Sequence, residues 1–162
     1  MEQDGNLEPY VTLRGHTGPL FTMCGSRSGA QDGMERVIYT AGSEGTIRVW
    51  HVPLLHEVNQ YGDTYDGKNY CIGEWSDDTN EPIWDIKHNP YQNMLLSVSA
   101  SNQVFLWNTN QVDPAKPDIP GKILNTFQFS SPLSRPLQQN PQTISQCDTP
   151  TSCAWLDTNV SQ

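Results

Sequence analysis

Two stretches of the sequence follow the same pattern: an apolar strand, a tight polar turn, and a second strand that ends in tryptophan. Residues 36–51 read R-V-I-Y-T-A-G-S-E-G-T-I-R-V-W-H, and residues 94–108 read M-L-L-S-V-S-A-S-N-Q-V-F-L-W-N. Their β-branched and aromatic residues suit a pleated, half-buried surface, and the short turns suit antiparallel hairpins. A repeated hairpin predicts an all-β protein built from recurring sheet units.

The segments around these hairpins alternate between strand-like and turn-like composition. Additional strands are predicted at 7–14, 19–24, 70–75, 83–88, 123–129 and 151–156. A propeller blade repeats every ~40–45 residues. Trp50 and Trp107 are further apart than that, and we interpret the irregular stretch 51–69 as an insertion that supplies the extra residues. We therefore expect four-stranded antiparallel blades, arranged as an incomplete β-propeller.

This pattern also predicts how the chain is divided. Residues 1–6 are expected to be a disordered N-terminus, and 7–129 to form the blades, with Trp-ended units near 15–51 and 79–108. Residues 130–150 are rich in Pro, Gln and Ser, which predicts a disordered insertion. The last stretch, 151–162, is predicted to begin a further blade.

The charge and cysteine content narrow the classes of partner. The net charge is −9 with only nine Lys and Arg, which argues against nucleic acid or an anionic membrane surface as the main partner. No apolar run reaches the length of a membrane span, and no signal peptide opens the sequence, so we expect a cytoplasmic protein without membrane insertion. The four cysteines form no C-x-x-C pair and are interpreted as reduced thiols.

Candidates for catalysis or metal binding are weak. His16 has no second ligand at metal-binding spacing, and the acidic pair Asp77-Asp78 lacks the spacing of an EF-hand loop. Cys24 and Cys153 have no visible base to activate a thiolate. The sequence therefore predicts a non-enzymatic protein with no catalytic, cofactor or metal site.

The Trp-ended units resemble WD repeats, the four-stranded blades of a β-propeller. In that family a corner His, a strand Ser or Thr, a turn acid and the Trp form a hydrogen-bonded chain. The resemblance places this structural network at His16, Thr40, Glu44 and Trp50, with Glu44 longer than the usual Asp. Partners that satisfy one another inside a low-dielectric core would lock the blade.

The second unit keeps only part of that pattern. Ser97 and Trp107 match, whereas Thr79 stands about where the His should be, and Ser101-Asn102 replaces Asp-Gly. We expect this blade to be held by strand packing without the network.

Longer phrases resemble the C-terminal propeller of the striatin family. They are E-P-Y-V-T-L-R-G-H-T-G-P-L-F, I-W-D-I, L-L-S-V-S-A-S-N-Q-V-F-L-W-N and P-T-S-C-A-W-L, in the family's order over about two thirds of the chain. The resemblance implies about two and a half blades of an expected seven. The family's coiled coil, and the segment linked to caveolin and calmodulin binding, have no counterpart in this sequence.

The function implied by the resemblance is that of a scaffold. Striatins are regulatory subunits of protein phosphatase 2A and assemble kinases and adaptor proteins around it, so a striatin-like subunit of a phosphatase–kinase signalling complex is expected. The alternative is a WD-repeat adaptor of another complex, such as a substrate receptor for ubiquitin ligation. Exposed loop residues are the candidates for partner contact: Arg14, Tyr65, Tyr91, Gln92 and Arg135.

Overall fold

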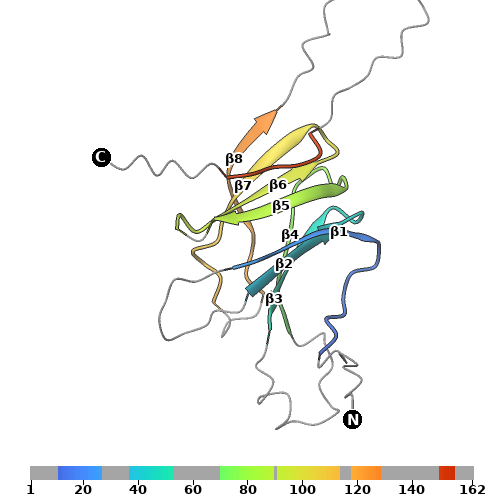
Figure 1. The fold of residues 1–162 in the computed structure, drawn as a ribbon, viewed down its shortest axis with the longest axis vertical. Coiled ribbons are helices and arrows are strands. Elements are labelled where there is room, and N and C mark those ends of the chain that lie inside the picture. Colours follow the sequence, from blue (N-terminus) through green and yellow to red (C-terminus); the bar gives the residue numbers. More distant parts are fainter. Residues whose placement is uncertain are drawn as a thin grey trace, which may run out of the picture.

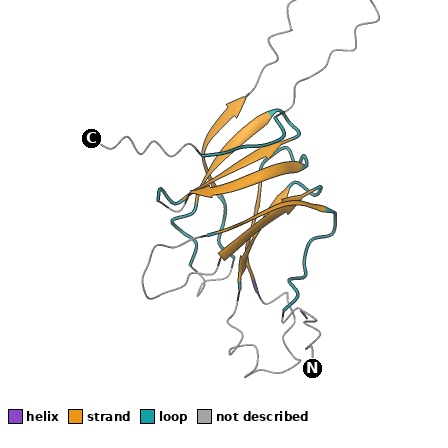
Figure 2. Cartoon of the chain, viewed as in Figure 1, coloured by secondary structure: helices purple, strands orange, loops and turns teal. Residues whose placement is uncertain are grey.

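The computed structural model describes residues 11–26, 37–52, 70–89, 91–113, 118–128 and 150–155. These residues form two four-stranded antiparallel sheets (Figures 1 and 2). The first sheet has the order β1 (Leu20–Gly25), β2 (Val37–Gly42), β3 (Thr46–His51), β4 (Cys71–Ser76). The second has the order β5 (Ile83–Asn89), β6 (Met94–Ser99), β7 (Gln103–Asn108), β8 (Lys122–Gln128).

The two sheets repeat each other in register as well as in strand order. The bulge after Leu20 in β1 matches the bulge after Ile83 in β5, and the irregularity before Trp50 matches the one before Trp107. In both sheets each strand pairs with the next one along the chain, and tight turns join β2 to β3 and β6 to β7. This correspondence lets each residue of the first blade be compared with its counterpart in the second.

The hydrophobic core lies between the sheets, where β1 and β2 contact β5. Trp75 of β4 and Trp107 of β7 stack with ring centroids 5.9 Å apart, and each is 1% exposed. Tyr39 of β2 packs on Trp75 at 5.8 Å. Among the described residues, one cluster of buried side chains therefore joins both blades.

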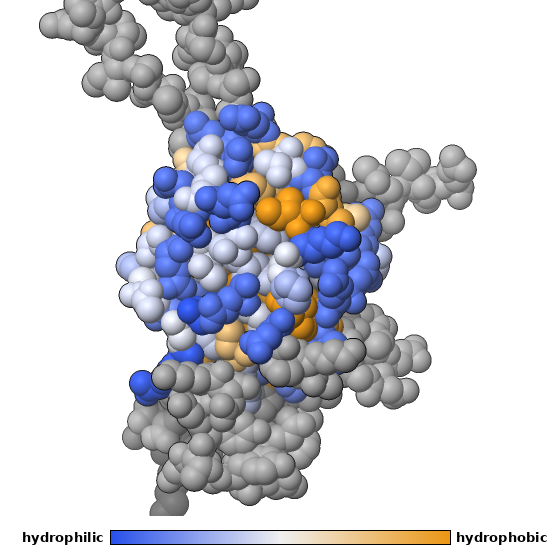
Figure 3. Space-filling model, turned by 180° about the vertical axis from the view of Figure 1, so that it is seen from behind, coloured by the Kyte–Doolittle hydropathy of each residue, from blue (hydrophilic) through white to orange (hydrophobic). Residues whose placement is uncertain are grey.

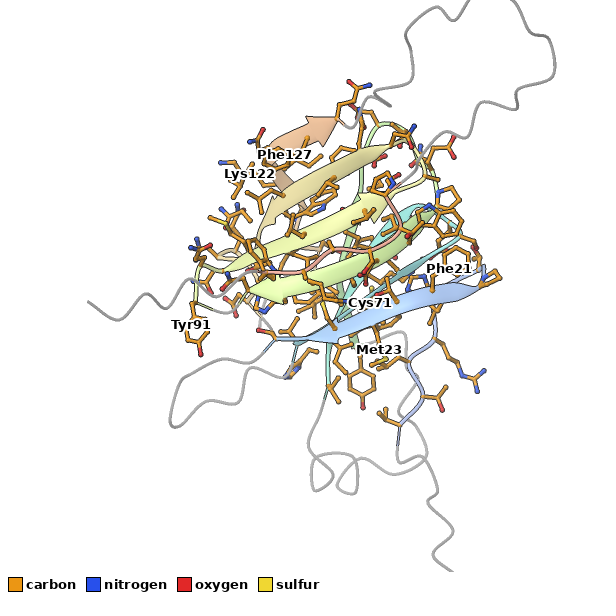
Figure 4. The ribbon with its side chains drawn as sticks, turned by 45° about the horizontal axis from the view of Figure 1, so that its top comes forward. Phe21, Met23, Cys71, Tyr91, Lys122 and Phe127 are labelled. Atoms are coloured by element: carbon orange, nitrogen blue, oxygen red, sulfur yellow. The ribbon has the colours of Figure 1, made fainter. Side chains whose placement is uncertain are left out.

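Counterparts in the two blades differ in exposure, which reveals two open faces. Leu20 and Met23 of β1 are 54% and 66% exposed, whereas their counterparts Ile83 and Ile86 are 2% and 0% exposed against the first blade. We call Leu20 and Met23 the leading face. Met23 points away from the sheet in Figure 4. Figure 3 shows apolar patches among the polar surface of the face it displays. The trailing face is the outer strand β8, all of whose residues are exposed.

Two predicted strands, 7–14 and 151–156, show no strand pairing over their described residues, 11–14 and 151–155, although both have strand-like composition. A strand requires a neighbour bonded through backbone N–H and C=O groups. Residues 150–155 lie against β5, but their contacts go to the Asp85 side chain and through the Trp155 side chain, so no ladder forms there. The predicted disordered stretches 1–6 and 130–150, apart from Pro150, lie outside the described residues, as do the candidates Tyr65 and Arg135.

Candidate functional site

A chain of side-chain hydrogen bonds runs through the first blade, from its tryptophan to its turn. The Trp50 indole N–H donates to Thr40 Oγ1 at 2.7 Å, and Thr40 Oγ1 lies 2.6 Å from His16 Nε2. His16 Nδ1 pairs with Glu44, whose other carboxylate oxygen accepts from the Thr17 N–H at 2.9 Å and from the Thr17 hydroxyl at 2.7 Å. The structure therefore brings together all four positions predicted in this blade.

The donors and acceptors of this hydrogen-bonded series match a neutral imidazole at His16. If His16 carries its proton on Nδ1, it donates to Glu44, and Nε2 is free to accept the Thr40 hydroxyl proton. Burial lowers the pKa of His16, although the hydrogen bond to Glu44 acts in the opposite direction. Burial alone would raise the pKa of Glu44, but the hydrogen bonds from Thr17 and His16 outweigh it and lower that pKa to about 2.

The second blade retains one bond of this kind. The Trp107 indole N–H donates to Ser97 Oγ at 2.9 Å. This blade therefore has a Trp–hydroxyl hydrogen bond in addition to strand packing. Thr79 instead bonds Asp77, through its N–H at 2.7 Å and its hydroxyl at 2.6 Å. Asn102 adopts a positive φ of 61°, as Gly45 does at 69° in the equivalent turn. The backbone of the turn is thus conserved between blades while its polar contacts differ.

Sequence reasoning missed the most heavily bonded side chain at the junction of the blades, Asp85 of β5. Its Oδ1 accepts from the Thr22 hydroxyl on β1 at 3.0 Å, the Ile86 N–H at 2.9 Å and Lys87 Nζ at 2.7 Å. Its Oδ2 accepts from Ser152 Oγ at 2.9 Å and the Cys153 N–H at 3.1 Å. One carboxylate thus joins both sheets and the 150–155 segment.

These donors keep Asp85 charged. Burial acts to raise the pKa of Asp85, but the hydrogen bonds from Lys87, Cys153, Ser152 and Thr22 lower it to about 2. The available signal was a single acid inside the apolar strand I-W-D-I, followed two residues later by a lysine. That pattern gives no information about Ser152 and Cys153, which are distant in sequence.

The thiols of Cys24 and Cys153 are poorly suited to nucleophilic chemistry. Burial raises the pKa of Cys24 to about 11 and that of Cys153 to about 12, so both remain protonated thiols near neutral pH. Across the described ranges, no group of three or more His, Cys, Asp or Glu side chains could hold a metal ion. The described part of the chain also contains no helix long and apolar enough to cross a membrane.

Removing the Thr40 hydroxyl tests whether the network locks the first blade. Thr40→Val keeps the shape but leaves the Trp50 N–H and His16 Nε2 without their shared partner. We expect the free energy of unfolding to fall by about 2–3 kcal/mol, because unpaired buried polar groups are costly. Ser97→Ala removes only one such contact and should cost about 1–2 kcal/mol. Urea unfolding followed by circular dichroism measures both; equal losses would contradict the network's role.

Acid should weaken the fold in two stages. His16 has a lowered pKa in the fold, so the unfolded chain binds more protons near its ordinary pKa of 6.5, and stability falls as pH drops through that region. Glu44 adds a second loss as pH falls from 4.5 towards about 2. Unfolding free energies across this range, for the native chain and His16→Asn, measure it. The variant should lose part of the upper stage, since burial also lowers the pKa of His88; an unchanged profile would contradict this account.

Comparisons with known proteins agree with this geometry. The family model "WD domain, G-beta repeat" matches residues 7–51 and 69–108. The chain is 33% identical over 128 residues to "Striatin homolog" of Dictyostelium discoideum, covering 79% of this chain and 14% of that protein. It is 32% identical over 109 residues to human "Striatin-3", covering 67% of this chain and 12% of that protein. The chain thus spans about one eighth of the length of these curated relatives.

A solved structure shows the same fold. A chain from the Polycomb Repressive Complex 2 of Chaetomium thermophilum, determined with GSK126 bound, superposes with a TM-score of 0.50 at 19% identity. The match covers 68% of this chain and 21% of that one, and it shows likeness of fold alone. The repeated register, the Trp-ended blades and the sequence matches lead to one conclusion. The chain belongs to the WD-repeat family and is a striatin-like member of it, with two blades of an open propeller described.

Proposed function

We propose that this chain contributes rigid blades to a striatin-like scaffold, which holds a phosphatase 2A-type assembly together with kinases and adaptor proteins. Family membership carries this proposal: the curated relatives are striatins. WD-repeat blades act by presenting loops from a fixed frame. We include a cytoplasmic location in the same proposal. We assign calmodulin binding to no residue of this chain.

The turn between β5 and β6 supports a binding role for one end of the second blade. Tyr91 in this turn is 88% exposed and projects away from the sheet (Figure 4). Exposed aromatic side chains are enriched in protein–protein interfaces, where they supply large contact area at low entropic cost. The Tyr91 and Gln92 N–H groups bond Asn89 Oδ1 at 3.0 and 3.3 Å, so the turn is held in one shape before a partner arrives.

A co-purification experiment tests the proposal. The tagged chain and its Tyr91→Ala/Gln92→Ala variant are expressed in the same cells, and captured phosphatase 2A subunits and kinases are quantified by mass spectrometry. Glu81→Ala is the matched control, because Glu81 is exposed near the opposite end of β5. We expect capture that the Tyr91 variant reduces and the control preserves.

The alternative function gives a different result in the same experiment. Enrichment of ubiquitin-ligase subunits in place of the phosphatase would favour a substrate receptor. Enrichment of neither group above an untagged control would contradict the scaffold proposal.

A further inference from the structure

The first strands of the two blades each carry an exposed aromatic side chain at a β-bulge. Phe21 lies in the bulge of β1 and Trp84 in the equivalent bulge of β5, so neither residue has a directly paired partner on the next strand. Their rings stack with centroids 5.2 Å apart and planes inclined by 15°. Bulges redirect side chains and are common beside functional sites. We call Phe21 and Trp84 the aromatic pair.

The exposure of Trp84 does not result from a missing neighbour blade. Its strand packs against the first blade, where Ile83 and Ile86 are 2% and 0% exposed, and residues 150–155 lie against the same strand. Trp84 nevertheless remains 37% exposed, and Phe21 is 44% exposed. Unlike the leading face, the aromatic pair therefore stays at the surface where two consecutive blades are already packed together.

Trp84 also has an unused hydrogen-bond donor. The chain has five tryptophans, and four of them donate their indole N–H to an oxygen: Trp50, Trp75, Trp107 and Trp155. The Trp84 indole N–H has no acceptor among the described residues. An exposed indole of this kind can pack its ring on a ligand and donate to a ligand carbonyl at the same time.

The rim of the blades around the aromatic pair carries negative charge. The Ser43 N–H donates to the Pro19 carbonyl at 3.0 Å, and Gly45 packs closely against Asn80, so the turn of the first blade and the loop before β5 meet here. The exposed Asp78 in this loop forms no ion pair with a described residue. The stretches at this rim contain no Lys or Arg: 15–22, 43–46 and 77–84. A ligand with positive charge therefore fits the rim.

We propose that the aromatic pair is a docking site for a proline-rich segment of a partner protein, flanked by Arg or Lys. Such a segment adopts the extended polyproline II conformation, whose backbone carbonyls have no internal hydrogen bonds. Its proline rings pack on the two aromatic rings, and one of its carbonyls accepts the Trp84 N–H. A flanking basic side chain lies near Asp78. This site goes beyond the scaffold function and does not depend on phosphatase binding.

Peptide titration into the full chain tests the proposal. The fluorescently labelled chain is kept at low concentration so that self-association does not compete, and microscale thermophoresis follows binding. The probe is an unlabelled peptide of six prolines with one arginine at each end, which should give saturable binding below about 1 mM. Two control peptides replace the six prolines by alanines or the two arginines by glutamates. Each control peptide should bind at least about fivefold more weakly, because each lacks one of the proposed contacts.

Matched variants of the chain identify the groups involved. Trp84→Phe keeps an aromatic ring but removes the N–H donor, and it should weaken binding about fivefold. Phe21→Ala/Trp84→Ala removes both rings and should abolish saturable binding. Phe127→Ala is the control, because Phe127 is a comparably exposed aromatic residue, 46% exposed, that lies far from Phe21 in Figure 4. It should leave binding unchanged.

The peptide controls and Trp84→Phe keep the test decisive even if the double variant does not fold. Absence of saturable binding to the native chain would overturn the proposal. Equal binding of the proline and alanine peptides, or of the arginine and glutamate peptides, would also overturn it, as would unchanged binding in Trp84→Phe. Because no phosphatase is present in this assay, its failure is distinct from failure of the scaffold function.

Discussion

Trp75→Ala is expected to remove most of the cooperative stability of the chain, at a cost of about 3–5 kcal/mol. Trp75 belongs to β4, yet it stacks on Trp107 of the second sheet, and Tyr39 of its own sheet packs against it at a tilt. Its indole N–H also donates to the Ile119 carbonyl at 2.9 Å. Truncation would open a cavity in the contact between the blades, and domains of this size have only about 5–15 kcal/mol in total.

Urea unfolding followed by far-UV circular dichroism measures this effect. Trp84→Ala is the matched control, because Trp84 is 37% exposed and stacks only on Phe21, at 5.2 Å, among the described rings. It should cost about 0.5–1.5 kcal/mol. Similar losses for the two variants would contradict the placement of the core between the blades.

Gly45→Ala is expected to cost about 3–4 kcal/mol for two separate reasons. Gly45 has a φ of 69°, in the left-handed region that alanine adopts only with strain. A Cβ at this position would also lie 2.5 Å from the backbone carbonyl carbon and oxygen of Asn80. Asn80 precedes β5, so the strain falls where the turn of the first blade meets the loop that leads into the second.

A second glycine provides the control. A Cβ at Gly25 would meet nothing within 4 Å, so Gly25→Ala should change the unfolding free energy by less than about 1 kcal/mol. Chemical unfolding of both variants measures the difference. A stable Gly45→Ala chain would indicate that the turn is not held against Asn80.

The strands were predictable from sequence wherever a hairpin supplied both partners. The two Trp-ended hairpins are recognisable because apolar periodicity and turn residues are local signals, and they appear as β2–β3 and β6–β7. Residues 11–14 and 151–155 have the same local signals and no strand pairing. Strand pairing is a property of two segments, so local composition alone could not distinguish these cases.

The candidate site residues were predictable only where a known repeat fixes the positions of their partners. The positions His16, Thr40, Glu44 and Trp50 followed from family resemblance, since their partners occupy fixed places in a known repeat. Asp85 could not be found in this way, because its partners Thr22 and Ser152 lie on different units of the chain. The loss of His in the second blade did not remove the Trp107–Ser97 bond, because that contact needs only two neighbouring strands.

Self-association of the 162-residue chain most directly tests the account of two propeller blades with open faces. Leu20 and Met23 are exposed where their counterparts Ile83 and Ile86 are buried, and β8 is an exposed edge strand. Exposed apolar faces and strand edges favour association. Sedimentation velocity over a wide concentration range should show a mass that rises with concentration for the native chain. The Leu20→Glu/Met23→Glu variant should associate less. A native chain that stays a compact monomer and melts cooperatively at every concentration would contradict the account.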